Sequence, residues 1–115
     1  MNDRSTTITE LKKIVEDFVN ERDWSQFHNP KNLSMALAIE ASELMDIFKW
    51  NSTEECEAKM SEQSTRQEAT DELADIMIYA IAFANRNDIN IADAIDKKMI
   101  KNRKKYPVKK FKGHF

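Results

Sequence analysis

Two pairs of carboxylates interrupt apolar patterns in this sequence. Glu40 and Glu43 lie in LAIEASELMDIFKW, residues 37–50, and Glu72 and Asp75 lie in DELADIMIYAIAFA, residues 71–84. The members of each pair are three residues apart, so on a helix they share one face. Apolar residues flank both pairs at helical spacing: Leu33, Leu37, Leu44 and Ile47 around the first pair, and Ile76, Tyr79 and Phe83 after the second. If these stripes face each other, four carboxylates meet near the core.

Such a cluster is unfavourable unless something compensates its charge. A buried unpaired carboxylate is costly, and like charges at close range add to the cost. Ligands that are all carboxylate oxygens select a hard cation such as Mg²⁺, Mn²⁺ or Ca²⁺. Di-iron carboxylate sites need Glu-x-x-His motifs, which His28 and His114 do not provide. Because short acidic motifs also arise by chance on solvated helices, the residues alone leave both a metal site and a solvated acidic face open.

The end of the chain is basic. Residues 97–115 carry nine Lys and Arg and no acid, whereas residues 1–96 carry nine basic residues and all twenty acids. Lys98, Lys101 and Lys105 are spaced to share a helix face, with Asn102 and Arg103 beside it. These types bind phosphate, although a solvated cationic helix end, favoured by the helix dipole, is the alternative. The acidic body argues against binding of nucleic acid.

Aromatic residues near these segments are candidates for stacking on a base, which contributes about 1–3 kcal/mol per contact. Trp24 and His28 lie in an irregular stretch, where ligand contacts are common. Trp50 ends the first acidic segment and Tyr79 follows Asp75 by one turn. For Trp50 and Tyr79, packing in the core is the alternative. We predict that three phenylalanines pack in the core: Phe18, Phe48 and Phe83.

The composition favours an all-α four-helix bundle that forms one domain. The chain has 115 residues with one Gly and two Pro, too few breakers for a β fold. Main helices are expected over residues 7–22, from a cap at Asn32 or Ser34 to residue 50, over 65–85, and over 91–105 after a cap at Asn90. A short helix follows the capping box of Ser52 and Glu55. The domain is expected over residues 1–107, with a basic tail at 108–115 that lacks a helical pattern.

The sequence also predicts the location of the protein and its assembly with further copies. The single Cys56 excludes an internal disulfide, and no apolar run approaches the roughly 20 residues of a membrane span. The first residues lack the apolar core of a signal peptide, so we expect a cytoplasmic protein without membrane contact. The apolar helix faces exceed what one small bundle covers, which predicts a homo-oligomer, either a dimer or a tetramer.

With these residues in view, the sequence resembles the all-α nucleoside triphosphate pyrophosphohydrolases of the MazG-like group. The acidic ExxE and ExxD pairs carry the likeness, together with the blocks RDWSQFHNPKNL, ELMDIFKW, DELADIMIYAIAFA and KNRKKYP. These blocks resemble the dCTP pyrophosphatase and integron-type branch over roughly residues 8–107. Ile39 stands where the broader group has a further Glu, which bears on the number of metal ions that the site can hold.

The resemblance implies an enzyme that hydrolyses (deoxy)nucleoside triphosphates to a monophosphate and pyrophosphate, with dCTP or non-canonical nucleotides as substrates and cleansing of the nucleotide pool as its role. It implies Mg²⁺, with Mn²⁺ as a possible substitute, bound by Glu40, Glu43, Glu72 and Asp75. The chemistry of the cluster adds the hypothesis that Glu40 or Glu43 is the base that takes a proton from water. It places phosphates at Lys98, Asn102, Lys101 and Arg103, and the base near Trp24, His28, Trp50 and Tyr79. The preferred base stays open, and a non-catalytic helical interaction module is the alternative.

Overall fold

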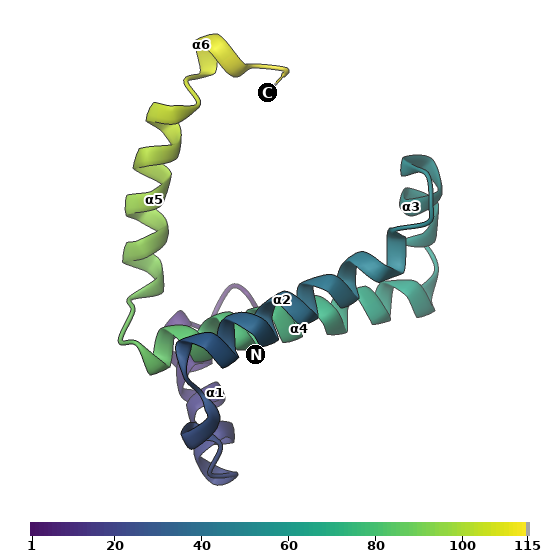
Figure 1. Cartoon of the computed structure of the whole chain (residues 1–115). Helices are drawn as coiled ribbons and strands as arrows, with labels where there is room; N and C mark the ends of the chain where they lie inside the picture. Colours follow the sequence, from purple (N-terminus) through teal and green to yellow (C-terminus); the bar gives the residue numbers. More distant parts are fainter. Residues whose placement is uncertain (115) are drawn as a thin grey trace.

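The computed structural model describes residues 1–114, and these residues fold entirely into helices and their connections (Figure 1). The elements are α1 (Ile8–Glu21), a 3-10 turn (Ser25–Phe27), α2 (Pro30–Phe48), α3 (Thr53–Lys59), α4 (Gln63–Arg86), α5 (Ile91–Lys105) and α6 (Val108–Phe111). The predicted all-α class is therefore confirmed. Within the described residues, no helix is long and apolar enough to cross a membrane.

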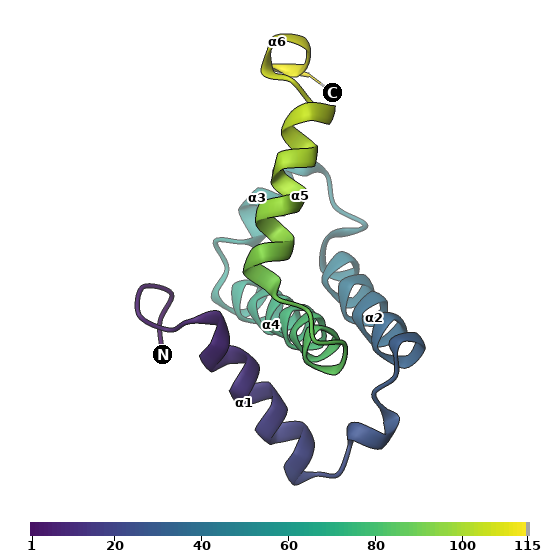
Figure 2. The same ribbon diagram turned by 90° about the vertical axis from the view of Figure 1, so that its left-hand side faces the viewer.

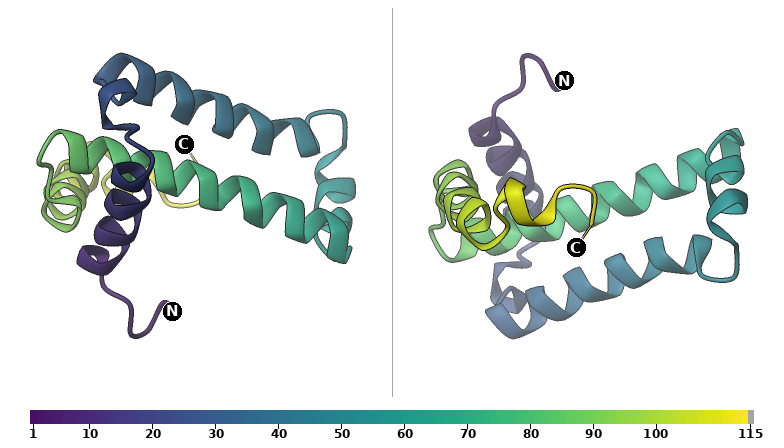
Figure 3. Two further views of the ribbon diagram at one scale, coloured as in Figure 1. Left: turned by 90° about the horizontal axis from the view of Figure 1, so that it is seen from below. Right: turned by 90° about the horizontal axis from the view of Figure 1, so that it is seen from above.

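The centre of the fold is the antiparallel pair of α2 and α4. The two helices lie side by side along most of their length, and α3 closes the turn between them at one end (Figure 3). The side chain of Asn29 caps α2 by accepting from the N–H of Asn32 at 2.8 Å, and Pro30 occupies the first helical position. The predicted caps at Asn32 and Ser34 were wrong. The helix begins earlier because Asn29 caps it and Pro30 fits the first helical position, where a missing N–H costs no hydrogen bond.

Helix α1 crosses α4 near the end where α4 meets α5 (Figures 2 and 3). Thr7 and Glu10 form a capping box that starts it. Val15 and Val19 pack with Leu33, Ile81 and Ala82 to form the buried core of the crossing. This core brings the second half of α1, the start of α2 and the last third of α4 together in one region.

Helix α5 leaves the α2–α4 pair at a wide angle and extends away from it (Figure 1). Asn90 caps it, as the sequence predicts, and it ends before Pro107. The following residues form the single turn of α6, where Tyr106 and Phe111 stack edge to face at 5.3 Å. This turn differs from the expected irregular tail, because Pro107 ends one helix and also starts the next. Phe115, the last residue of that tail, lies outside the described residues.

Several large apolar residues are exposed in the single chain. Phe18 was predicted to be core and is 46% exposed, and Leu73 and Met77 of α4 are similarly exposed. On α5, Ile95 is 59% exposed and Met99 is 41% exposed. The radius of gyration is 17.2 Å, against about 13 Å for a compact domain of this length. The apolar faces of α4 and α5 therefore have no covering partner within residues 1–114 of one chain.

Candidate metal centre and adjoining pocket

Three of the four predicted carboxylates meet between α2 and α4. Glu40, Glu43 and Glu72 each place one carboxylate oxygen within 4.8 Å of the others. Glu40 and Glu72 are half-buried and Glu43 is exposed at the edge of the cluster. Their helices bring them together because the i, i+3 spacing puts Glu40 and Glu43 on the face that α4 covers.

The charges of this cluster are not compensated by other side chains. One oxygen of Glu40 and one of Glu72 are inaccessible to water and have no hydrogen-bond partner. Burial, and then the neighbouring Glu43 and Asp75, raises the pKa of Glu40 to about 7. Burial and the neighbouring Glu43 also raise the pKa of Glu72. A group of carboxylate oxygens with unpaired buried atoms fits a hard divalent cation, which would satisfy them directly.

Asp75 stands slightly apart from the other three carboxylates. It is exposed, and it does not belong to the group whose oxygens lie within 4.8 Å of one another. Its negative charge still contributes to the raised pKa of both Glu40 and Glu72. Asp75 also lines the cavity beside the cluster, so it connects the candidate metal centre with that cavity.

An apolar cavity of about 340 Å³ adjoins the carboxylate cluster. We call it the apolar pocket. Its walls come from α1, the irregular stretch after it and one face of α4: Ile14, Val15, Phe18, Val19, Trp24, His28, Asp75, Ile78, Tyr79 and Ala82. A cavity that is mostly apolar, with a few polar groups and a carboxylate at one end, is typical of a small-molecule site.

Three of the four predicted base-contacting residues, Trp24, His28 and Tyr79, line the apolar pocket. Trp24 stacks edge to face on Phe18 at 5.7 Å, and the Arg22 guanidinium lies 3.7 Å from the centre of the Phe18 ring on which it stacks. Burial lowers the pKa of His28, which favours the neutral imidazole, a group that can both donate and accept a hydrogen bond.

Trp50 does not share this pocket. It follows the end of α2 beside α3 and is 87% exposed, with the Lys49 ammonium 5.4 Å from the centre of its ring. The 19 residues of α2 span about 28 Å, and Trp24 and His28 lie before its start. A base bound by His28 therefore does not reach Trp50 of the same chain.

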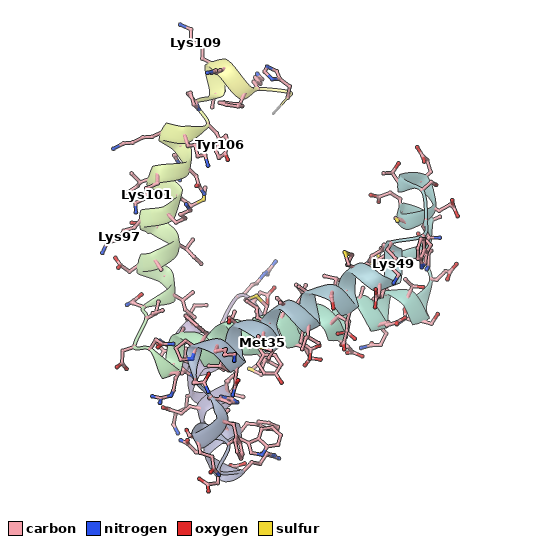
Figure 4. All side chains as sticks on the ribbon, in the orientation of Figure 1. Met35, Lys49, Lys97, Lys101, Tyr106 and Lys109 are labelled. Atoms are coloured by element: carbon pink, nitrogen blue, oxygen red, sulfur yellow. The ribbon has the colours of Figure 1, made fainter. Side chains whose placement is uncertain are left out.

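The predicted phosphate-binding residues all lie on α5, away from the carboxylates. Lys98 lines a shallow groove between α4 and α5, and the Asn102 amide contacts the sulfur of Met99 at 3.9 Å. In Figure 4 the Lys97 and Lys101 side chains point away from the α2–α4 pair. Asp75 lies about 16 Å back along α4 from its last residue, and Lys98 lies about 10 Å along α5, so the two do not meet in one chain.

Sequence reasoning missed the wall that α1 contributes to the pocket. Ile14 and Phe18 line it, although Phe18 was predicted to pack in the core. The signal was present in the width of the apolar stripe of α1, because residues 14, 15, 18 and 19 are all apolar. Val15 and Val19 are buried at the crossing with α4 and border the cavity, and Ile14 and Phe18 extend its wall.

An antiparallel helical pair carries a cluster of inward carboxylates and is crossed by a third helix that forms an apolar pocket, which defines an all-α scaffold with a candidate metal centre. The family model of the MazG-like family matches residues 35–114. The chain belongs to the MazG-like family.

Individual relatives agree with this assignment. The chain is 36% identical over 107 residues to dCTP pyrophosphatase 1 of Rattus norvegicus, covering 93% of this chain and 63% of that protein. It is 36% identical over 101 residues to dCTP pyrophosphatase 1 of Homo sapiens, covering 88% of this chain and 59% of that protein. The chain thus spans about three-fifths of the length of these relatives.

A solved structure shares the fold over nearly the whole chain. The crystal structure of a pyrophosphatase from Archaeoglobus fulgidus is similar with a TM-score of 0.82 at 33% identity, covering 93% of this chain and 98% of that one. The wide angle between α5 and the α2–α4 pair therefore belongs to an arrangement that matches a known protein of this type.

Proposed function

We propose that this protein is a Mg²⁺-dependent hydrolase that splits (deoxy)nucleoside triphosphates into a monophosphate and pyrophosphate. The observation that carries the proposal is the group of three carboxylates within 4.8 Å whose buried oxygens have no partner, next to an apolar pocket of about 340 Å³. The relatives named dCTP pyrophosphatase support the same reaction. Glu40, Glu43, Glu72 and Asp75 are the proposed ligands, and Mn²⁺ is expected to substitute for Mg²⁺.

The reaction adds water to the phosphorus of the α-phosphate and breaks its bond to the bridging oxygen. Bound Mg²⁺ neutralises phosphate charge, which the carboxylates alone would repel. We assign Glu40 or Glu43 to accept a proton from the attacking water, because both lie in the cluster and one is at its open edge. Pyrophosphate leaves, and the other product is the nucleoside monophosphate.

The base is proposed to occupy the apolar pocket. Trp24 and Tyr79 offer faces for stacking and the neutral His28 offers a hydrogen bond. Cytosine is the first candidate, since relatives are named for dCTP. The proposed role is removal of unwanted nucleotides from the pool, in the cytoplasm, where the sequence predicts the protein to be.

We further propose that the working unit contains two or more copies. The single chain exposes 9350 Å², whereas a compact monomer of its mass exposes about 6,500 Å². The excess is larger than the roughly 800 Å² per partner of an ordinary interface. The phosphate-binding candidates on α5 and Trp50 cannot join the pocket of their own chain, so a second copy is needed to bring them to it.

Product analysis tests the reaction. A panel of deoxynucleoside triphosphates is incubated with and without Mg²⁺, and the products are separated. We expect equal amounts of monophosphate and pyrophosphate, only with Mg²⁺, and almost none from Glu43→Gln. Release of inorganic phosphate with diphosphate as the other product, or no product from any nucleotide, would contradict the proposal and favour a helical interaction module.

Mixing two inactive variants tests the shared site. Glu43→Gln removes a carboxylate from the cluster, and Lys98→Ala removes a cation from α5. If each site takes its cluster from one chain and Lys98 from another, refolding the variants together restores about a quarter of the activity in a twofold-symmetric dimer with random pairing. Failure to restore activity, in a mixture that light scattering shows to be dimeric or larger, would contradict the shared site.

A further inference from the structure

The last turn of α4 is fastened to the irregular stretch that carries His28. The Arg86 Nε donates to the backbone oxygen of His28 at 2.8 Å, although the two residues are 58 positions apart. The amide of the preceding residue, Asn85, donates to the backbone oxygen of Lys12 at 2.9 Å. Two successive residues of α4 therefore hold two different segments that border the apolar pocket.

The backbone at His28 has no regular secondary structure to fix it. Its φ of −92° and ψ of 77° are those of an inverse γ-turn, with the N–H of Asn29 donating to the oxygen of Phe27 at 3.2 Å. The Asn32 amide also donates to the oxygen of Phe27 at 3.0 Å. The carbonyl oxygen of His28 accepts from the Arg86 side chain. This hydrogen bond therefore fixes the peptide between His28 and Asn29.

His28 lines two cavities beside α1. One is the apolar pocket, where Asp75 and Tyr79 are its titratable neighbours. The other is a more polar cavity of about 290 Å³ whose titratable lining residues are Glu16, Arg86 and Asp88. The position of the His28 backbone therefore bears on the shape of both cavities.

We propose that Arg86 is a positioning residue that holds His28, and with it the preceding Trp24 segment, in place at the nucleoside half of the site. The proposal rests on the function given above, in which the apolar pocket takes the base. Without this hydrogen bond the segment must be ordered when the nucleotide binds, which lowers affinity for the nucleoside part. The cluster on the other side of the pocket makes no contact with Arg86, so the chemical step is left intact.

A pair of substitutions separates the hydrogen bond from charge and bulk. In Arg86→Gln the amide nitrogen stands at the same number of bonds from the backbone as the arginine Nε, so a donor is kept without charge. In Arg86→Met the chain length is kept without a donor. Arg66→Met, an exposed position near the start of α4 with no side-chain partner among residues 1–114, is the matched control.

We expect Arg86→Met to raise the KM for a deoxynucleoside triphosphate about tenfold, the size of one hydrogen bond to a charged donor, with kcat within about twofold. Affinity for Mg²⁺-pyrophosphate, which lacks a base, should not change. Arg86→Gln and Arg66→Met should behave like wild type. Equal KM values for the Met and Gln variants at position 86 would overturn the proposal, and so would a loss of pyrophosphate affinity.

Nuclear magnetic resonance of the histidines gives a second measurement that does not depend on catalysis. The sequence has only His28 and His114, and His114→Gln assigns the two signals. We expect the pKa of His28 to stay below its usual value in wild type and Arg86→Gln, and to return toward it in folded Arg86→Met, because the imidazole becomes more exposed. An unchanged His28 pKa in folded Arg86→Met would contradict the positioning role. If wild type hydrolyses no nucleotide, the function fails while this measurement still tests Arg86.

Discussion

The α2–α4 pair and the α4–α5 groove depart from ordinary packing in opposite ways. Between α2 and α4, charged side chains stand where apolar ones are expected, and carboxylate oxygens of Glu40 and Glu72 are buried without partners. Along α4 and α5, apolar side chains such as Ile95 and Met99 are exposed. The first departure supports the proposed divalent cation, and the second supports the proposed contact with a second copy of the chain. Each region is incomplete in a single chain, and each lacks a different partner.

The largest effect is expected from breaking the carboxylate cluster. Glu72→Gln keeps the size of the side chain but removes a charge that a cation needs, so pyrophosphate release should fall about 100-fold or more. Glu68→Gln, an exposed acid one turn earlier on α4, should leave the rate within about twofold. Steady-state rates at saturating Mg²⁺ make the comparison. Equal losses in both variants would show that overall charge, not the cluster, matters.

Breaking the apolar groove should change the assembly. Ile95→Asp puts a charge on the exposed apolar face of α5, so the mass measured by light scattering should fall to that of the 13.4 kDa monomer. Activity should fall with it if the site is shared. Lys97→Glu alters charge on the side of α5 that points away from the pair, and its assembly should persist (Figure 4). A wild-type protein that is monomeric at micromolar concentration would refute the proposed role of the groove.

Substitutions of the two tryptophans distinguish the part of the site that one chain forms from the part that a second copy is proposed to add. Trp24→Ala should raise KM about tenfold, because stacking on the base is lost. Trp50→Ala should raise KM only in the assembled protein, because Trp50 cannot reach the pocket of its own chain. Measuring KM for both variants in the wild-type and Ile95→Asp backgrounds sharpens the comparison of the two regions. A Trp50→Ala effect that persists in the monomer would contradict sharing.

The smallest effect concerns the pH dependence of the metal-free protein. The pKa of Glu40 is raised from about 4.5 to about 7 on folding, so the folded state binds more protons than the unfolded state between these values. This contribution to stability is complete below pH 4.5 and is lost as the pH rises through 7. Thermal melting without metal should therefore show stability falling from pH 5 to 8, and Glu40→Gln should fall less. A wild-type stability that rises over this range, with no difference from Glu40→Gln, would be contrary to this account.

Much of this architecture could be predicted from the sequence because helices are local. The helical period, the caps at Ser52 and Asn90 and the stop at Pro107 define most of the main elements within two or three residues. The meeting of Glu40, Glu43 and Glu72 followed from placing the acidic pairs within apolar stripes. These features depend only on spacing along one helix and on one pairing of helices.

The rest could not be predicted because it depends on how helices cross. The exposure of Phe18 and the wall it gives to the apolar pocket arise from the angle at which α1 crosses α4. The direction of α5 is determined by four residues, 87–90, among which Asp88 takes a φ of +53°. The hydrogen bond from Arg86 to His28 joins residues 58 apart and leaves no periodic signal. Pattern alone also gave no reason to separate Trp50 from Trp24.

The central claim is that the inward carboxylates of α2 and α4 are tolerated because they bind a divalent cation. Calorimetric titration of Mg²⁺, and of Mn²⁺ as the tighter-binding substitute, into metal-free protein tests it most directly. We expect saturable binding in wild type and Glu68→Gln, and a loss of at least tenfold in affinity in Glu40→Gln and Glu72→Gln. Weak, unsaturable heat that is the same in all four proteins would contradict the claim.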